Sequence, residues 1–271
     1  MLALSLTGPV VDHAHDNSPR GAVVGRVSYA LGKVEGFSVH LGANAGYVLV
    51  PPRKRNAEST VPLQLKETPE LDVDPTQLID TGVIAADHAS VLGLEFAAQR
   101  DNLFLQSEAF TIGAQRKGGD PDPGRDPRFG GWYVEGSWVL TGERRRFDPS
   151  RAAFWFPKPN RPFGRGGWGA WEVALRFSRM NLNFHPGAEG EAPARDGVRG
   201  GDQKVTAASL SWYPRPRVRV MLEALRVSVD RLNPASPQDP QPFGPPPATP
   251  PVGVQIGQSF NALAMRLRYA F

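Results

Sequence analysis

Alternation of apolar and polar side chains is the dominant pattern of the chain, and the last fourteen residues show it most regularly. The large apolar positions there are Leu263, Met265, Leu267, Tyr269 and Phe271, and the small or basic positions between them are Ala262, Ala264, Arg266, Arg268 and Ala270. Successive side chains of a strand point to opposite faces, so the pattern predicts a strand with one apolar and one basic face. A strand this long that ends on an aromatic residue is typical of transmembrane β-barrels.

The same alternation predicts about eleven strands in all. The clear ones are Ser90–Gln99, Leu103–Gly113, Gly131–Thr141, Gly169–Asn181, Val205–Tyr213 and Val218–Val229, besides the last strand. Weaker patterns cover Leu2–Thr7, Ala22–Lys33, Gly36–Val50 and Val61–Val73. One face should be convex and apolar, with Val173, Leu175, Leu210, Trp212, Leu267 and Tyr269 exposed. The other should be concave and carry Arg176, Arg219, Arg266 and Arg268.

The expected fold is all-β, an antiparallel up-and-down transmembrane β-barrel that forms a single domain over residues 1–271. No run of about 18 to 20 apolar residues could form a membrane-spanning helix. Single-chain bacterial barrels have even strand numbers, so an odd set of about eleven indicates that N-terminal strands are missing. The opening MLALSLTGPVVD lacks the features of a signal peptide, which is therefore also expected to be missing.

One connection breaks the expected alternation of short and long connections. The turn at Pro214–Pro216 is short, and the segments Asn183–Gln203 and Asp230–Ile256 lie on the opposite side of the membrane, where loops are long. Gly142–Trp168 should also be a short turn, yet it is long and rich in proline. It carries the basic residues Arg144, Arg145, Arg146, Arg151, Lys158, Arg161 and Arg165 against only Glu143 and Asp148.

Composition narrows the function classes. The chain has no cysteine, which excludes disulfides, thiolate catalysis and Cys-based zinc sites. His13, His15 and Asp16 lie in a loop-like segment, and we expect no metal site, no cofactor and no catalytic residues. The net charge of +4 fits nucleic acid, anionic lipid or small anions as partners, and charge alone does not choose among them.

The basic connection and its flanks carry a family resemblance. The run FGGWYVEGSWVLTGERRRFDPSRAAFWFPKPNRPFGRGGWGAWEVALRFSRMNLN resembles the phosphate-selective porin O/P family of Gram-negative outer membranes. LIDTGVIAADHASVLGLEFAAQRDNLFLQSEAF and SLSWYPRPRVRVMLEALRVSVDR are similar to the same family, so the resemblance covers roughly residues 75–271.

The resemblance implies a homotrimer of barrels with about sixteen strands each, of which this chain would hold the C-terminal part. It implies contact with outer-membrane lipid and lipopolysaccharide, and no nucleic acid as partner. It also implies that Gly142–Trp168 and the outer loop Asp74–His88 enter the pore. The constriction of the family also uses an earlier loop that lies upstream of Met1.

Arginine suits phosphate because its planar guanidinium donates two hydrogen bonds at once. The candidate pore-lining residues are Arg144, Arg145, Arg146, Arg151, Lys158, Arg161, Arg165, Arg176, Arg219, Arg266 and Arg268. We expect the connection to fold back along the concave face and to contact anions chiefly through Lys158, Arg161 and Arg165. The aromatic residues Phe154, Trp155 and Phe156 would anchor it to the wall.

Other interpretations of these residues stay open. The connection could be a solvated loop or contact anionic lipid, and the wall arginines could form cross-strand ion pairs with Glu95, Glu108, Glu135, Glu172 and Glu223. The sequence favours a non-enzymatic outer-membrane porin for passive diffusion of anions, phosphate or polyphosphate. The alternatives are a general porin with mild anion preference and a soluble basic β-protein that binds nucleic acid.

Overall fold

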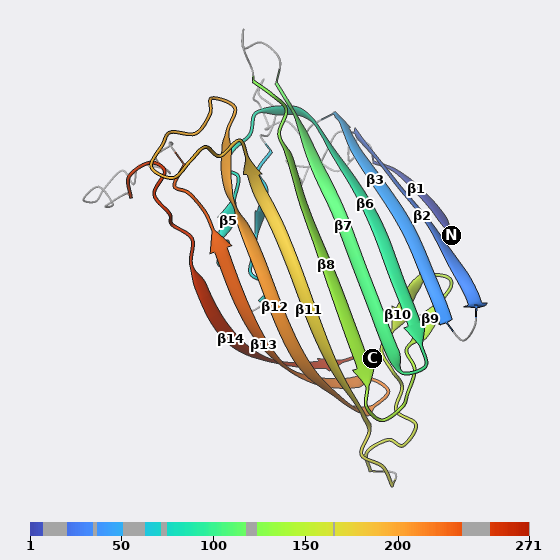
Figure 1. The fold of residues 1–271 in the computed structure, drawn as a ribbon. Coiled ribbons are helices and arrows are strands. Elements are labelled where there is room, and N and C mark those ends of the chain that lie inside the picture. Colours follow the sequence, from blue (N-terminus) through green and yellow to red (C-terminus); the bar gives the residue numbers. More distant parts are fainter. Residues whose placement is uncertain are drawn as a thin grey trace, which may run out of the picture.

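The computed structural model describes residues 1–7, 21–34, 37–50, 63–71, 75–117, 124–164, 166–234 and 250–270. A ten-stranded antiparallel sheet dominates it, and each strand pairs with the wall strands next to it along the chain. Figure 1 shows this sheet as one curved wall. Its strands are β1 (Leu2–Thr7), β2 (Gly21–Val34), β3 (Phe37–Val50), β6 (Ala86–Arg100), β7 (Leu103–Arg116), β8 (Arg128–Val139), β11 (Ala170–Phe184), β12 (Val198–Arg215), β13 (Val218–Asp230) and β14 (Ser259–Tyr269).

The outer, convex face of the sheet is apolar, as the alternation predicts. Leu210 lies opposite Leu222, and Leu222 lies opposite Met265, so one apolar row crosses three strands. Leu222 is 46% exposed and Met265 is 76% exposed. Leu175, Leu210, Leu267 and Tyr269 are exposed as expected, whereas Val173 and Trp212 are half-buried. A continuous exposed apolar surface of this kind marks an interaction surface for lipid or protein.

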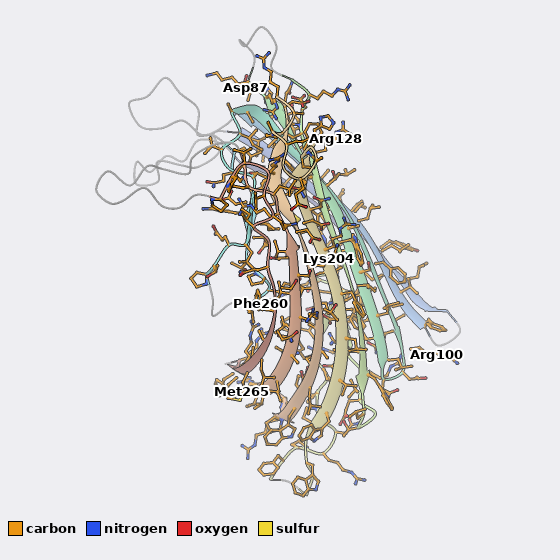
Figure 2. The ribbon with its side chains drawn as sticks, turned by 60° about the vertical axis from the view of Figure 1, so that its left-hand side comes forward. Asp87, Arg100, Arg128, Lys204, Phe260 and Met265 are labelled. Atoms are coloured by element: carbon orange, nitrogen blue, oxygen red, sulfur yellow. The ribbon has the colours of Figure 1, made fainter. Side chains whose placement is uncertain are left out.

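The two ends of the sheet differ, and they confirm the expected order of connections. At one end, called the turn end here, residues 101–102 and 216–217 form short turns. At the other, called the loop end, the long connections 185–197 and 231–258 lie. Figure 2 shows Arg100 towards the turn end, with Asp87 and Arg128 at the loop end. The β8–β11 connection, residues 140–169, starts and finishes at the turn end.

The expected strand Val61–Val73 is wrong as a strand of the wall. Within its described part, only β4 (Lys66–Glu67) is a strand, and it pairs with β5 (Ile79–Asp80) rather than with the wall. Pro69 lacks a backbone donor and Glu70 has a φ of 61°, so a regular strand ends there. Among the described residues the wall therefore has ten strands and not about eleven, so the inference from an odd strand number does not hold.

The described residues form an open sheet with β1 and β14 as its two edges. An open, curved sheet fits the expectation that the chain holds only part of a larger barrel. The expected fold class, an all-β antiparallel up-and-down sheet, is confirmed. The described ranges contain no helix with the length and apolar character needed to span a membrane.

The segment with β4 and β5 packs on the inner, concave face near the loop end. Ile79 is fully buried in a cluster with Leu182 and Val227 of the wall. Arg231 donates hydrogen bonds to the carbonyls of Leu78 (3.2 Å) and Asp80 (2.9 Å). Residues 75–85 of the loop expected to enter the pore, Asp74–His88, thus lie inside the curve. Asp74 lies outside the described residues, and residues 86–88 belong to β6. His13, His15, Asp16 and Phe271 also lie outside the described residues.

Candidate functional site

The β8–β11 connection contains a small hairpin of β9 (Arg146–Asp148) and β10 (Ala153–Trp155). Its turn is closed by Asp148, which accepts hydrogen bonds from the Ser150 hydroxyl (2.6 Å), the Ser150 amide (2.9 Å) and the Trp155 indole (3.1 Å). These donors stabilise the ionised carboxylate, chiefly the Ser150 hydroxyl and then the Trp155 indole, and lower the pKa of Asp148 to about 2. Figure 1 shows the hairpin behind the sheet, near the turn end of β6 and β7.

Aromatic rings hold the hairpin against the inner face. The ring of Phe154 lies 5.0 Å from that of Phe147 and 4.9 Å from that of Phe104 on β7. Phe147 in turn lies 5.9 Å from the His40 ring on β3. Such tilted and edge-on arrangements are favoured for aromatic pairs. The expectation that the connection folds back along the concave face, with Phe154 as an anchor, agrees with these contacts.

An ion pair joins the start of the connection to the wall. Arg145 donates to Glu172 Oε1 on β11 through Nη2 (2.7 Å) and Nε (3.0 Å). Glu172 also accepts from the Ser137 hydroxyl (2.8 Å) and the Tyr213 hydroxyl (2.6 Å). The side chains of Arg145 and Glu172 are 9% and 1% exposed. A buried and fully paired guanidinium has no charge to spare for an anion, so this geometry fits a structural role for Arg145 better than an anion contact.

Glu143 bends the connection into a closed loop. It is 5% exposed. Its carboxylate accepts hydrogen bonds from the Thr141 hydroxyl and from the amide of Asn160 (3.0 Å). The Thr141 hydroxyl oxygen accepts a hydrogen bond from the amide of Trp171, near the start of β11, at 3.1 Å. The outgoing and returning parts of the connection are therefore fixed to each other at the turn end.

The second part of the connection turns to the outer side. The Phe163 ring lies 5.6 Å from the Trp212 ring, and the Trp212 indole donates to the carbonyl of Trp168 (2.7 Å). Trp171 stacks on Trp212 at 5.8 Å, so an aromatic group lies at the turn end and includes Phe163 and Trp168 of the connection. Arg161 is exposed, and its carbonyl accepts a hydrogen bond from the Gly169 amide at 3.0 Å, while Arg165 lies outside the described residues.

A cavity of about 480 Å³ lies between the first part of the connection and the turn end of β12–β14; it is called the basic cavity here. Its lining includes the basic residues Arg144, Arg146, Lys158, Arg217, Arg219 and Arg268 and the aromatic residues Trp155, Phe156 and Tyr213. No acidic residue belongs to the part of its lining that the structure describes. Five candidates from the sequence therefore meet here. Of the three chiefly expected contacts, Lys158 is among them and Arg161 is not, while Arg165 lies outside the described residues.

Local structure explains why Lys158, Arg144 and Arg146 face the basic cavity. Pro157 and Pro159 are buried while Lys158 between them is exposed. Arg144 and Arg146 are exposed on either side of half-buried Arg145, as alternation along an extended segment requires. A smaller cavity of about 320 Å³ lies on the other side of the hairpin and shares these three arginines with Gln99 and Ser38 of the wall.

The remaining wall arginines are neutralised. Arg176 lies 3.2 Å from Glu70 of the β4 segment and 3.5 Å from Glu135 of β8, and its guanidinium lies 3.8 Å from the Tyr133 ring. Arg266 lies within electrostatic reach of Glu223 on the neighbouring strand. For these two residues the ion-pair interpretation fits better than pore lining.

Two basic residues near the cavity and the hairpin remain, Arg151 and Arg217. Arg151, at the hairpin turn, is exposed and stacks on the Trp155 ring at 5.2 Å. Arg217 was missed by sequence reasoning because it lies in the short β12–β13 turn. Its place beside Arg219 and opposite the last strand was the available signal, since a short turn brings neighbouring strand ends together.

Across the part of the chain that the structure describes, no group of three or more His, Cys, Asp or Glu side chains could hold a metal ion. The geometry at the turn end offers arginine and lysine donors on a concave wall. Donors of this kind bind anions through charge-assisted hydrogen bonds.

Comparison with known proteins identifies the family. A Caulobacter vibrioides protein described as uncharacterized is 27% identical over 222 residues, which cover 81% of this chain and 40% of that protein. The chain thus spans less than half the length of this relative. A family model described as phosphate-selective porin O and P matches residues 4–271, including residues 4–74, which the resemblance did not cover, and the chain therefore belongs to this family.

Proposed function

We propose that the chain forms part of the wall of a water-filled outer-membrane pore through which small, phosphate-like anions diffuse passively. One observation carries the proposal. The β8–β11 connection lies on the concave face, and its Arg144, Arg146 and Lys158 share a cavity with Arg219 and Arg268 of the wall. Porins of this family are channels, so an enzymatic role is not implied.

The charge distribution suits diffusion better than tight capture. Arg144 lies 3.9 Å from Asp101, whose side chain is 77% exposed, so this contact is screened by water. Lys158 is exposed and can exchange partners with water readily. A path of such groups attracts an anion and replaces part of its hydration but releases it again, as conduction requires.

Location and assembly follow from the apolar face and from the family. The exposed leucines of the convex face suit outer-membrane lipid and lipopolysaccharide, with the turn end towards the periplasm. Further strands would pair with the open edges β1 and β14, because unpaired backbone groups are too costly in lipid. A homotrimer is the assembly that the family resemblance implies.

Structural features support one of the two alternative functions and weigh against the other. A general porin with mild anion preference is favoured by the neutralised Arg145 and Arg176, which reduce the net positive field. A soluble protein that binds nucleic acid is disfavoured, because the face opposite the basic residues is a broad exposed apolar surface.

The test uses the full-length protein in planar bilayers. The reversal potential in a potassium chloride gradient gives the anion-to-cation permeability ratio, and added phosphate should block the chloride current. The variant Arg144→Gln/Arg146→Gln/Lys158→Gln should lower the ratio and weaken the block. Arg161→Gln removes one charge from the same connection outside the cavity and should change neither value. Unchanged values in the triple variant would reject the proposal.

A further inference from the structure

We propose that the basic cavity is a binding site for an aromatic anion, a planar ring that bears a phosphate or carboxylate group. The inference deepens the proposed function and rests on it, since it names a substrate class for the same cavity. Inorganic phosphate accounts for the basic residues but not for the other walls.

Those other walls are aromatic and apolar. Trp155 and Phe156 of the connection face the cavity from one side, and Tyr213 of β12 lines it with Pro216 and Val218 of the turn end. A hydrated oxyanion gains nothing from such surfaces, whereas a ring that leaves water for them does. Aromatic walls with a few placed charged groups are the usual lining of small-molecule sites.

The size of the cavity agrees with this ligand. Its volume of about 480 Å³ lies within the range of roughly 300 to 1,000 Å³ typical of small-molecule sites. A single tetrahedral oxyanion would leave most of it empty. An aromatic ring with one anionic substituent fills the space between the walls while the substituent reaches the guanidinium groups.

Two guanidinium groups lie over one ring and are oriented by it. Arg219 lies 4.5 Å and Arg268 lies 5.2 Å from the centre of the Phe156 ring. Arg219 is also fixed by hydrogen bonds to the Ser211 hydroxyl at 3.2 and 3.0 Å. Among the described residues the Arg268 side chain makes no hydrogen bond or ion pair, and it lines the basic cavity, where its donors can meet an anion. Stacked guanidinium groups present their donors edge-on, which suits two-point contact with a carboxylate or phosphate.

The aromatic walls are preorganised. The Tyr213 hydroxyl donates to Glu172 at 2.6 Å, and the Trp155 indole donates to Asp148 at 3.1 Å. The Phe156 ring packs 6.0 Å from the Tyr213 ring. Rings that are already held in place lose little entropy when a ligand binds, which favours affinity.

The experiment compares three probes of similar charge on the full-length protein: 4-nitrophenyl phosphate, butyl phosphate and inorganic phosphate. Block of the chloride current in bilayers and equilibrium dialysis in detergent micelles give two independent measures of binding. We expect 4-nitrophenyl phosphate to act at a concentration at least about tenfold lower than either of the other two. Equal potency of the three probes would overturn the proposal.

Variants assign the effect to the cavity. Phe156→Leu should remove the preference for the aromatic probe and leave block by inorganic phosphate nearly unchanged. Arg268→Gln should weaken block by all three probes. Phe163→Leu, an aromatic residue of the same connection on the outer side, and Arg161→Gln are the matched controls and should change neither. A preference that persists in Phe156→Leu would place the aromatic probe elsewhere and reject the assignment.

The outcomes also separate this inference from the proposed function. Anion selectivity without preference for the aromatic probe would reject the inference and leave the proposed function standing. Binding of the aromatic probe in micelles by a protein that shows no anion selectivity in bilayers sinks the proposed function, and the inference is then wrong as a statement about a permeating substrate.

Discussion

Glu172 on β11 and Arg145 at the start of the β8–β11 connection form a buried ion pair, with Arg145 Nη2 2.7 Å from Glu172 Oε1. The guanidinium of Arg145 also lies 4.5 Å from the Phe104 ring. This pair joins the segment that carries the cavity arginines to the rigid wall. It therefore sets where Arg144 and Arg146, its chain neighbours, can point.

Glu172→Gln should destabilise the protein strongly. The substitution keeps the shape but leaves the Arg145 charge buried without a counter-charge, a change that typically costs about 3–5 kcal/mol. Arg145→Met/Glu172→Gln should recover most of this loss, because no buried charge remains. Urea unfolding in detergent micelles, followed by tryptophan emission, measures both. Arg144→Gln is the matched control and should stay within about 0.5 kcal/mol of the unsubstituted protein. Equal stability of Glu172→Gln and the control would contradict the role of the pair.

The hairpin of β9 and β10 should loosen at acid pH. The Asp148 carboxyl has a pKa of about 2 instead of 3.8. A carboxyl whose pKa is lowered by folding stabilises the fold above its ordinary pKa and loses this contribution as pH falls towards the lowered value. The change should lie between about pH 4 and 2. Proteolysis of residues 146–155 by pepsin, sampled across this range, should increase with acid. Asp148→Asn should show weaker pH dependence, and an identical profile in the variant would contradict the assignment.

Strand positions and faces could be predicted from the sequence because alternation records which side chains meet lipid and which meet the inner side. Leu175 and Leu267 are exposed on the outer face as expected. The weak segment Val61–Val73 failed as a wall strand because its described apolar residue Leu71 is buried by tertiary packing on the inner face, and its strand β4 pairs with β5 and not with the wall. Leu71 belongs to the same buried cluster as Ile79. Periodicity cannot distinguish these two kinds of burial.

The candidate site could be predicted only as a segment. Arg144, Arg145 and Arg146 are identical in type and adjacent, yet Arg145 is buried in an ion pair and the other two line the basic cavity. What separates them is the position of Glu172, which is distant from the segment before it folds back. The sequence contained both residues but no signal that they pair. Lys158 lines the basic cavity and Arg161 does not, and the sequence carries no signal for this difference, because the bend between them is fixed by the hydrogen bond from the Asn160 amide to Glu143.

Leu210→Arg should impair membrane assembly, and Ser209→Arg should not. Leu210 lies on the outer face at 39% exposure, in the apolar row with Leu222 and Met265, whereas Ser209 points to the inner side. An arginine on the lipid face near the middle of the membrane costs about 2–4 kcal/mol. The folded fraction in lipid vesicles, measured by heat-modifiable gel mobility, tests both variants. If the two variants assemble equally well, the outer face does not contact lipid.

Glu70→Gln should raise anion selectivity, the opposite direction to Arg144→Gln/Arg146→Gln/Lys158→Gln. Glu70 lies on the segment with β4 and reaches across the inner face to Arg176 at 3.2 Å. Removing its charge leaves Arg176 with Glu135 alone, so the path gains net positive charge. The permeability ratio should rise by roughly twofold at low salt. It should return towards the value of the unsubstituted protein at high salt, where ions screen the charge over a short distance. Both side chains are about 30% exposed, so stability should fall by no more than about 1 kcal/mol. Glu67→Gln, on the same segment but without an ion pair among the described residues, is the control and should leave the ratio unchanged. A ratio that stays constant in Glu70→Gln, or that rises equally in the control, would show that Arg176 does not face the path taken by ions.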